Sequence, residues 1–240
     1  MKPTLVLLPG MLCDHAYFQA QLPELQRIAE VSVACYPRVT TIAAMAQQVL
    51  REAPERFAVG GHSMGGRVAQ EIVGCAPERV LGVGLFGTDY RGFADDHERL
   101  REQARHQEWL ELVDRQGFDR FAEQWAPPLV APRRQSDRAL IEVIAQMARR
   151  MGREALDAHC LAGLSRVDYA WLLPRISVPT VFITGSEDSF RSADLHHQMA
   201  SLVPGATVAI IRGAGHMAAM EDPQAVNAAM IPWIRRLRAT

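Results

Sequence analysis

The segment 57–73 places one serine at a sharp turn between an apolar strand and a helix, and this constrains the fold more than any other part of the chain. A run of small apolar residues ends in Gly61-His62-Ser63-Met64-Gly65, and an amphipathic helical pattern follows. Side chains at Gly61 and Gly65 would collide with the neighbouring strand or helix. Such a turn strains the backbone of Ser63 and holds its hydroxyl clear of the sheet, where a base and a substrate can reach it.

Strand-like and helical patterns alternate on both sides of this turn. The strand candidates lie at 4–8, 31–36, 57–61, 80–86, 180–184 and 206–211. They are too apolar to leave one face in water, which is typical of a parallel sheet covered by helices on both faces. We therefore expect an α/β fold with a mostly parallel, doubly wound sheet.

The alternation stops near residue 90 and resumes near residue 174. Residues 91–173 contain no strand candidate and carry charged helical patterns, of which the clearest covers 137–151. The length of 240 residues suits one large domain with an insertion. We expect residues 1–90 and 174–240 to form the core, and residues 91–173 to form a helical insertion.

Charge and hydropathy argue against several classes of partner. The formal net charge of -1 gives no electrostatic reason to expect nucleic acid or an anionic membrane. No apolar run approaches the roughly 20 residues that span a bilayer, and no leader pattern opens the chain. The four scattered cysteines form no C-x-x-C pair and are expected to be buried free thiols in a reducing compartment. These features favour a cytoplasmic protein that acts on a small molecule.

A serine hydroxyl needs a base within hydrogen-bond reach to act as a nucleophile at neutral pH. His216 is the best candidate, because it follows a strand and lies among glycines at the carboxyl edge of the expected sheet. Asp188 lies just past the end of the strand at 180–184 and is the expected acid that orients the imidazole. Glu187 beside it and Asp89 after the fourth strand are rivals for that role. The order Ser, Asp, His along the chain is the one expected for this architecture.

The negative charge that develops on an attacked carbonyl oxygen requires two preorganised donors. We expect these to be the backbone N–H groups of Met64, at the start of a helix, and of Met11, in the loop after the first strand. The two methionine side chains would also line an acyl pocket as soft apolar walls.

The remaining histidines and the glycine-rich segments carry weaker signals. His62 is expected to pack in the core, because adjacent strand residues point to opposite faces. His196 and His197 are expected on a solvated helix face. No His, Cys or Asp cluster has metal-ligand spacing, and the glycines fit neither a P-loop nor a dinucleotide fingerprint. We therefore expect no metal and no cofactor.

Four motifs together resemble the α/β-hydrolase superfamily, in its small lidded branch of serine esterases and C–C hydrolases. They are Leu7-Leu8-Pro9-Gly10-Met11, Gly61-His62-Ser63-Met64-Gly65-Gly66, Gly185-Ser186-Glu187-Asp188 and Gly213-Ala214-Gly215-His216. The resemblance covers nearly the whole chain and implies an α/β-hydrolase fold with residues 91–173 as a helical lid (cap) over the active site. Many relatives have His-Gly where this chain has Pro9-Gly10, so any structural bond from that histidine must be replaced here.

The leading hypothesis is a carboxylesterase-like serine hydrolase that cleaves an ester of a small to medium, apolar acyl group through an acyl-Ser63 intermediate. The candidate walls of its substrate pocket are Trp109, Trp125 and Met147. The motif at 63–67 also resembles that of a menaquinone-pathway lyase, so Arg67 is either an anion contact or simply an arginine on the first turn of a helix. That lyase reaction and the hydrolysis of C–C bonds are alternatives with the same triad. A non-catalytic ligand-binding receptor on this fold is a hypothesis of a different class.

Overall fold

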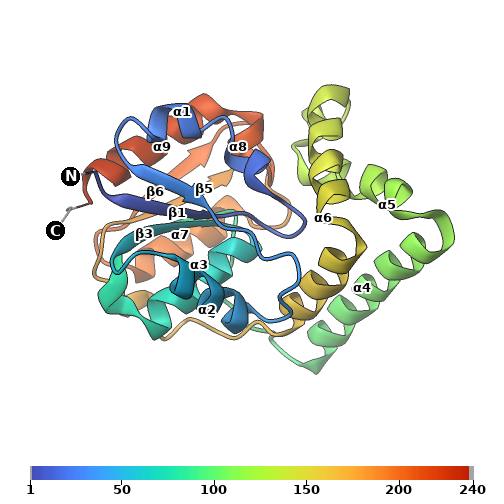
Figure 1. Cartoon of the computed structure of the whole chain (residues 1–240), viewed down its shortest axis with the longest axis horizontal. Coiled ribbons are helices and arrows are strands. Elements are labelled where there is room, and N and C mark those ends of the chain that lie inside the picture. The colour runs from blue at the N-terminus through green and yellow to red at the C-terminus, as the bar shows by residue number, and fades with distance from the viewer. Residues whose placement is uncertain (1, 238–240) are drawn as a thin grey trace.

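The computed structural model describes residues 2–237, and its centre is a six-stranded parallel sheet (Figure 1). The strands are β1 (Thr4–Leu8), β2 (Glu30–Val33), β3 (Phe57–His62), β4 (Val80–Phe86), β5 (Thr180–Gly185) and β6 (Thr207–Ile211). They lie in the order β2-β1-β3-β4-β5-β6, and every neighbouring pair is parallel. The expected α/β class with a parallel sheet is confirmed, although the second strand ends at Val33 and is shorter than predicted.

Helices cover both faces of the sheet, which makes it doubly wound (Figure 1). One layer holds α2 (Ile42–Glu52), α3 (Met64–Cys75) and α7 (Ala193–Leu202), and the other holds α1 (Leu22–Leu25), α8 (Ala218–Glu221) and α9 (Pro223–Arg235). The strands β3, β4 and β5 are buried at every position, because each contributes side chains to a separate hydrophobic core on either face.

The segment between β4 and β5 carries the helices α4 (Asp96–Gln116), α5 (Phe118–Trp125) and α6 (Arg138–Leu164). They form a group of their own beside one end of the sheet (Figure 1). Gly117, at φ +85°, separates α4 from α5, and Gly152, at φ +76°, interrupts α6. The predicted helix at 137–151 therefore corresponds to the first half of α6, before this interruption. Short 3-10 helices complete the fold at His15–Phe18, Pro77–Arg79, Pro127–Leu129, Pro132–Arg134 and Leu173–Arg175.

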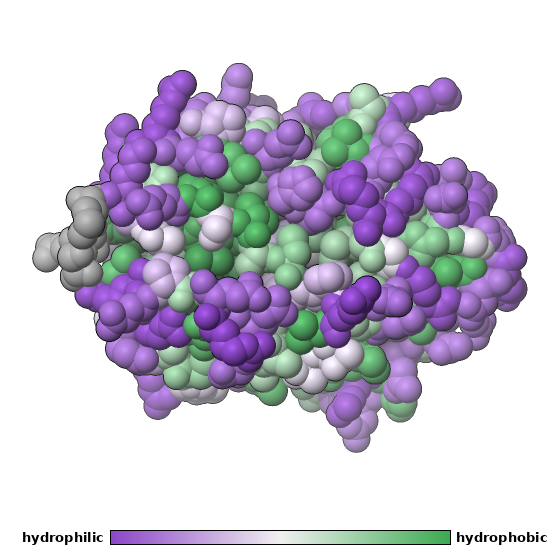
Figure 2. Space-filling view, viewed as in Figure 1, coloured by the Kyte–Doolittle hydropathy of each residue, from purple (hydrophilic) through white to green (hydrophobic). Residues whose placement is uncertain are grey.

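Hydrophilic side chains cover most of the face shown in Figure 2 and surround smaller apolar areas. Within residues 2–237, no helix combines the length and the apolar character that crossing a bilayer requires.

All four cysteines are free thiols, as expected, but only Cys13 and Cys160 are buried. Cys75, the last residue of α3, is exposed.

Candidate active site

Ser63 lies at the turn between β3 and α3, in a backbone conformation that non-glycine residues rarely adopt. Its φ is +52° and its ψ is -114°. A Cβ atom at Gly61 would clash with the Gly65 carbonyl, and one at Gly65 would clash with the Leu8 carbonyl. The two glycines therefore allow α3 to start directly against the sheet, and the sharp turn projects the Ser63 side chain beyond the strand ends.

The structure brings Ser63, His216 and Asp188 together into one hydrogen-bonded chain. Ser63 Oγ donates to Nε2 of His216 at 3.0 Å, and Nδ1 of His216 donates to Oδ2 of Asp188 at 2.9 Å. Ser63 follows β3, Asp188 follows β5 and His216 follows β6. Because the carboxyl ends of parallel strands meet at one edge, residues far apart in sequence become neighbours there.

Asp188 is held ionised by its surroundings. Burial opposes its ionisation, but the charge and the hydrogen bond of His216 outweigh this, together with the N–H groups of Arg191 and Phe190. These interactions lower the pKa of Asp188 to about 2. Of the two rival acids, Glu187 is exposed and Asp89 forms an ion pair with Arg91 at 3.0 Å. Among the described residues, Asp188 alone supplies a carboxylate to the imidazole of His216.

The two expected oxyanion donors lie beside Ser63. Met64 is the first residue of α3, and the first N–H groups of a helix have no acceptor within the helix. Met11 belongs to the loop that follows β1, and both residues line the same cavity as Ser63. The loop is anchored at Pro9, whose carbonyl accepts from Tyr36 Oη at 2.9 Å.

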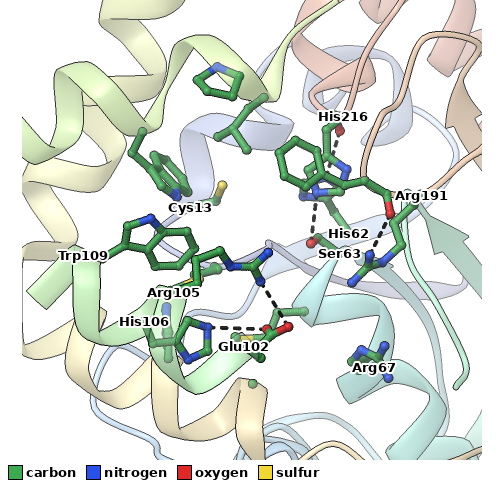
Figure 3. Close-up of a pocket in the computed structure, with 18 of the residues that line it drawn as sticks. Cys13, His62, Ser63, Arg67, Glu102, Arg105, His106, Trp109, Arg191 and His216 are labelled. Atoms are coloured by element: carbon green, nitrogen blue, oxygen red, sulfur yellow. Dashed lines mark hydrogen bonds and ion pairs between the residues drawn. The ribbon is translucent and has the colours of Figure 1, made fainter. Parts of the chain in front are cut away.

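The cavity at Ser63 has a volume of about 300 Å³. Trp109 lies across it from Ser63 and His216 (Figure 3), and Trp125 is also part of its wall. Met147 was expected there, and the structure contradicts this. Its side chain is fully buried among the residues of the hydrophobic core, so it cannot form part of the cavity wall.

A further part of the cavity wall is charged. Arg67 lines the cavity as expected, and Arg105, Arg166 and Arg191 join it. The sequence analysis did not single out the last three, which lie on α4, after α6 and after β5. No group of three or more His, Cys, Asp and Glu side chains in residues 2–237 has the geometry to hold a metal ion.

Comparison with known proteins identifies the family of the chain. The family model described as the alpha/beta hydrolase family matches residues 5–229. The chain belongs to the alpha/beta hydrolase family.

Individual relatives of this α/β hydrolase have different names. A putative carbamate hydrolase, RutD, from Escherichia coli O139:H28 is 26% identical over 251 residues, which covers 95% of this chain and 90% of the relative. A malate-bound esterase from Thermogutta terrifontis has a TM-score of 0.83 and 27% identity, and the match covers 99% of this chain and 92% of that one. MenH from S. aureus has a TM-score of 0.82 over 97% of this chain and 93% of its own, but at 18% identity the likeness concerns the fold alone.

The neighbouring residues His196 and His197 on α7 differ in the burial of their side chains. His197 is exposed, as expected, but the expectation for His196 was wrong, because its side chain is fully buried. Successive residues of a helix point about 100° apart, so one of two neighbours can face the sheet while the other faces water. Nε2 of His196 accepts from the N–H of Thr88 at 3.3 Å, and burial lowers the pKa of this imidazole.

His62 packs directly behind the hydrogen-bonded chain. Its ring stacks on Tyr17 with 4.1 Å between the centroids, and its Nε2 donates to the carbonyl of His216 at 3.0 Å. Burial and the neighbouring His216 lower its pKa well below the usual value, so it stays neutral. His62 therefore helps to fix the backbone of the loop that carries His216.

His159, on α6, is a site residue that the sequence analysis missed. Its Nδ1 accepts from the N–H of Leu12 at 3.1 Å, and its Nε2 donates to the carbonyl of Tyr36 at 3.3 Å. Leu12 follows Met11 and has a φ of +54°, so this bond fixes a strained point of the loop. His159 and Tyr36 thus anchor the loop in a chain that has Pro9 where many relatives have histidine. The only signal in the sequence is a polar residue on a largely apolar helix face.

We expect a His159→Ala substitution to lower kcat about tenfold, because the N–H of Leu12 loses its acceptor and the adjacent Met11 donor shifts. A His159→Gln variant is the matched control, since its side chain can accept and donate at the same places. Steady-state kinetics of the three proteins with a neutral ester would test this. Equal kcat values for His159→Ala and the wild type would show that the bond does not position the loop.

The stability of the His159→Gln variant is expected to differ from that of the wild type in acid. Burial lowers the pKa of His159 to about 4, so the unfolded chain binds a proton below pH 6.5 that the folded protein does not. This imidazole therefore costs no stability above pH 6.5 and about 3 kcal/mol by pH 4. Urea unfolding at pH 7 and pH 5 should show a smaller pH-dependent loss for His159→Gln than for the wild type.

Proposed function

We propose that this α/β hydrolase is a serine hydrolase that cleaves a carboxylic ester of a small to medium acyl group through an acyl-Ser63 intermediate. The single observation that carries the proposal is the hydrogen-bonded chain from Asp188 through His216 to Ser63 at the wall of a cavity. Nucleophile, base and orienting acid are then in mutual reach, which is the geometry that activates a serine hydroxyl.

The mechanism follows from this arrangement. Nε2 of His216 takes the proton of the Ser63 hydroxyl as Oγ attacks the ester carbonyl, and Asp188 stabilises the imidazolium. The N–H groups of Met11 and Met64 donate to the oxyanion. His216 then gives its proton to the departing alkoxide, which leaves acyl-Ser63. A water molecule, deprotonated by His216, attacks this acyl group, and the proton returns to Ser63 as the acid leaves.

The inserted helices supply the substrate-facing walls in this proposal. Trp109 comes from α4 and Trp125 from α5, and both line the cavity of Ser63. We infer that residues 91–173 act as a lid over the site and that these tryptophans contact the acyl group. The cavity volume of about 300 Å³ suits a ligand of small to medium size.

A carbamate is the second candidate substrate, because the E. coli relative is named a putative carbamate hydrolase. The same serine attack on a carbonyl would cleave it. C–C bond hydrolysis and a lyase reaction with the same triad remain alternative functions. Both reactions act on acidic substrates, and arginines line the cavity. A panel of aryl esters, aryl carbamates and carboxylated diketones would rank these reactions by kcat/KM. Clear diketone cleavage without ester turnover would overturn the esterase proposal.

A serine-directed fluorophosphonate probe tests the proposal most directly. We expect the wild type to be labelled on Ser63 and the Ser63→Ala variant to remain unlabelled, because only an activated hydroxyl reacts with the probe. Gel fluorescence and peptide mass spectrometry would identify the labelled residue. A folded wild-type protein that takes no label would contradict the proposal and favour a receptor that uses the fold for binding.

A further inference from the structure

Two arginines lie beside Ser63, Arg67 buried and Arg191 half-buried, and the backbone N–H of each is bonded to a member of the hydrogen-bonded chain. Arg67 is 6% exposed and lies one helical turn beyond Ser63, whose carbonyl accepts its N–H at 3.4 Å. The N–H of Arg191 donates to Oδ1 of Asp188 at 2.9 Å. Both side chains line the cavity of Ser63 and lie on the same side of it as Ser63 (Figure 3).

Both arginines also line a second cavity of about 450 Å³. The two cavities share six wall residues, and these are Arg67, Glu102, Arg105, Arg166, Phe190 and Arg191. The cavities therefore meet at these six residues, which include both arginines. A molecule whose reacting carbonyl lies at Ser63 could place its other end at this junction.

The charges around the second cavity are not balanced. Five arginines and four carboxylates line it. Three of the arginines have carboxylate partners: Arg91 pairs with Asp89, Arg105 with Glu102, and Arg166 with Glu98 and Glu102. The fourth carboxylate, Asp168, accepts from two backbone N–H groups. Within residues 2–237, neither Arg67 nor Arg191 has a carboxylate within the 4.0 Å of an ion pair.

The hydrogen bonds of the two guanidinium groups leave most of their donors free. Nη1 of Arg67 donates to the carbonyl of Arg91 at 2.9 Å, and Nη1 of Arg191 donates to the carbonyl of Phe190 at 2.7 Å. A guanidinium has five N–H donors in a planar fork. No other acceptor in the described part of the chain binds either group, so the remaining donors are available to a ligand.

The position of Arg67 costs stability, which argues against a purely structural role. A buried charge without a partner is unfavourable, and burial together with the neighbouring Arg191 lowers the pKa of Arg67 to about 9. Arg67 also lies in the first turn of α3, where the helix dipole disfavours a cation. Side chains of a helix lean toward its N-terminus, so this arginine points back toward the Ser63 end.

We propose that Arg67 and Arg191 bind a carboxylate of the substrate, and that the preferred substrates are esters carrying one such group. This rests on the proposed function and deepens it by naming the substrate class. A carboxylate matches the planar fork of a guanidinium and can accept two N–H donors at once. A single negative charge also balances the one arginine in excess over the carboxylates of the second cavity.

Matched ester pairs test this proposal. Monoethyl succinate, glutarate and adipate carry a carboxylate where ethyl butanoate, pentanoate and hexanoate carry a methyl group, and acid release in a pH-stat gives kcat/KM for each. We expect the wild type to prefer the charged member of at least one pair. Arg67→Met and Arg191→Met are each expected to lower the charged-to-neutral ratio about 10- to 100-fold. Arg67→Lys, which keeps the charge but not the fork, should fall between.

The control is Arg175→Met, because Arg175 is exposed and lines neither cavity. Its charged-to-neutral ratio should equal that of the wild type. Hydrolysis of the neutral esters by Arg67→Met shows that this variant is folded. A wild-type ratio of one or less for every pair, or an unchanged ratio in both arginine variants, would overturn the proposal.

Calorimetry with the Ser63→Ala variant separates this inference from the proposed function. Monoethyl glutarate should bind Ser63→Ala, and binding should weaken about 10- to 100-fold in Ser63→Ala/Arg67→Met. If neither ester set is hydrolysed but this difference in binding remains, the hydrolase proposal fails and the carboxylate site stands. If ester hydrolysis depends on Ser63 but the double variant binds as tightly as Ser63→Ala, the carboxylate site fails and the hydrolase proposal stands.

Discussion

A Ser63→Ala variant is expected to lose about 10⁴- to 10⁶-fold in kcat for ester hydrolysis. Without Oγ there is no nucleophile for His216 to activate, and the reaction falls back on direct attack by water. The N–H groups of Met11 and Met64 and the cavity remain, so a small residual rate over the uncatalysed reaction should persist. Initial rates with p-nitrophenyl butyrate would give the loss in kcat, and a pre-steady-state burst of p-nitrophenol in the wild type would report acyl-Ser63.

Ser201→Ala is the matched control for this experiment. Ser201 lies on the exposed side of α7, and its hydroxyl only donates to the carbonyl of Gln198 at 2.7 Å. The same chemical deletion at this position should leave kcat within about twofold of the wild type, since surface substitutions of this kind rarely alter a site. A loss below about tenfold in Ser63→Ala would show that this serine is not the nucleophile.

The features that the sequence predicts well are those that local patterns determine. Continuous apolar runs locate the strands, because a strand buried on both faces has no polar side. The two-residue spacing of Gly61 and Gly65 around Ser63 predicts the sharp turn, because a side chain at Gly61 would clash with the Gly65 carbonyl and one at Gly65 with the Leu8 carbonyl of the neighbouring strand β1. The parallel order of the strands then implies which loops share an edge.

The features that the sequence does not predict depend on contacts between distant segments. His159 reaches Leu12 from 147 positions away, and nothing in the pattern of α6 indicates this partner. Met147 was expected at the cavity wall as an apolar residue of the insertion, but the fold buries it in the hydrophobic core. The sequence also gives no means of telling His196 from His197, because the two adjacent residues are identical and the apolar periodicity of this short helix is weak.

The charge balance of the cavity could not be derived from the sequence for the same reason. The chain is nearly neutral, with 26 basic and 27 acidic residues. Only the fold shows that Arg105 and Arg166 lie against acidic partners while Arg67 and Arg191 do not. The carboxylate preference proposed above therefore depends on Arg67, on the core helix α3, and on Arg191, in the loop after β5.

An Asp188→Asn variant is expected to lower kcat about 10⁴-fold at neutral pH. An asparagine amide would donate to Nδ1 of His216 instead of accepting from it. The proton of the neutral imidazole would then lie on Nε2, which could no longer accept the proton of the Ser63 hydroxyl. The imidazolium formed during attack would also lose its counter-charge. Steady-state kinetics with a neutral ester, alongside the ellipticity of each variant, would separate this effect from misfolding.

The stability of Asp188→Asn should depend on pH with a definite sign. The pKa of Asp188 is about 2 in the folded protein and near 3.8 when unfolded, so its ionised form stabilises the fold by about 2 kcal/mol above pH 4. This contribution disappears as the pH falls through 2. Urea unfolding of the variant should therefore show the full deficit at pH 7 and a shrinking one in acid.

Glu187→Gln and Asp89→Asn decide whether the acid has been assigned correctly. Glu187 is exposed and Asp89 is engaged by Arg91, so neither change should lower kcat for a neutral ester by more than about tenfold. If either variant lost as much activity as Asp188→Asn, that residue and not Asp188 would be the acid that orients His216. If all three carboxylates were dispensable, His216 would act without an orienting acid, and its 2.9 Å bond to Asp188 would be structural only.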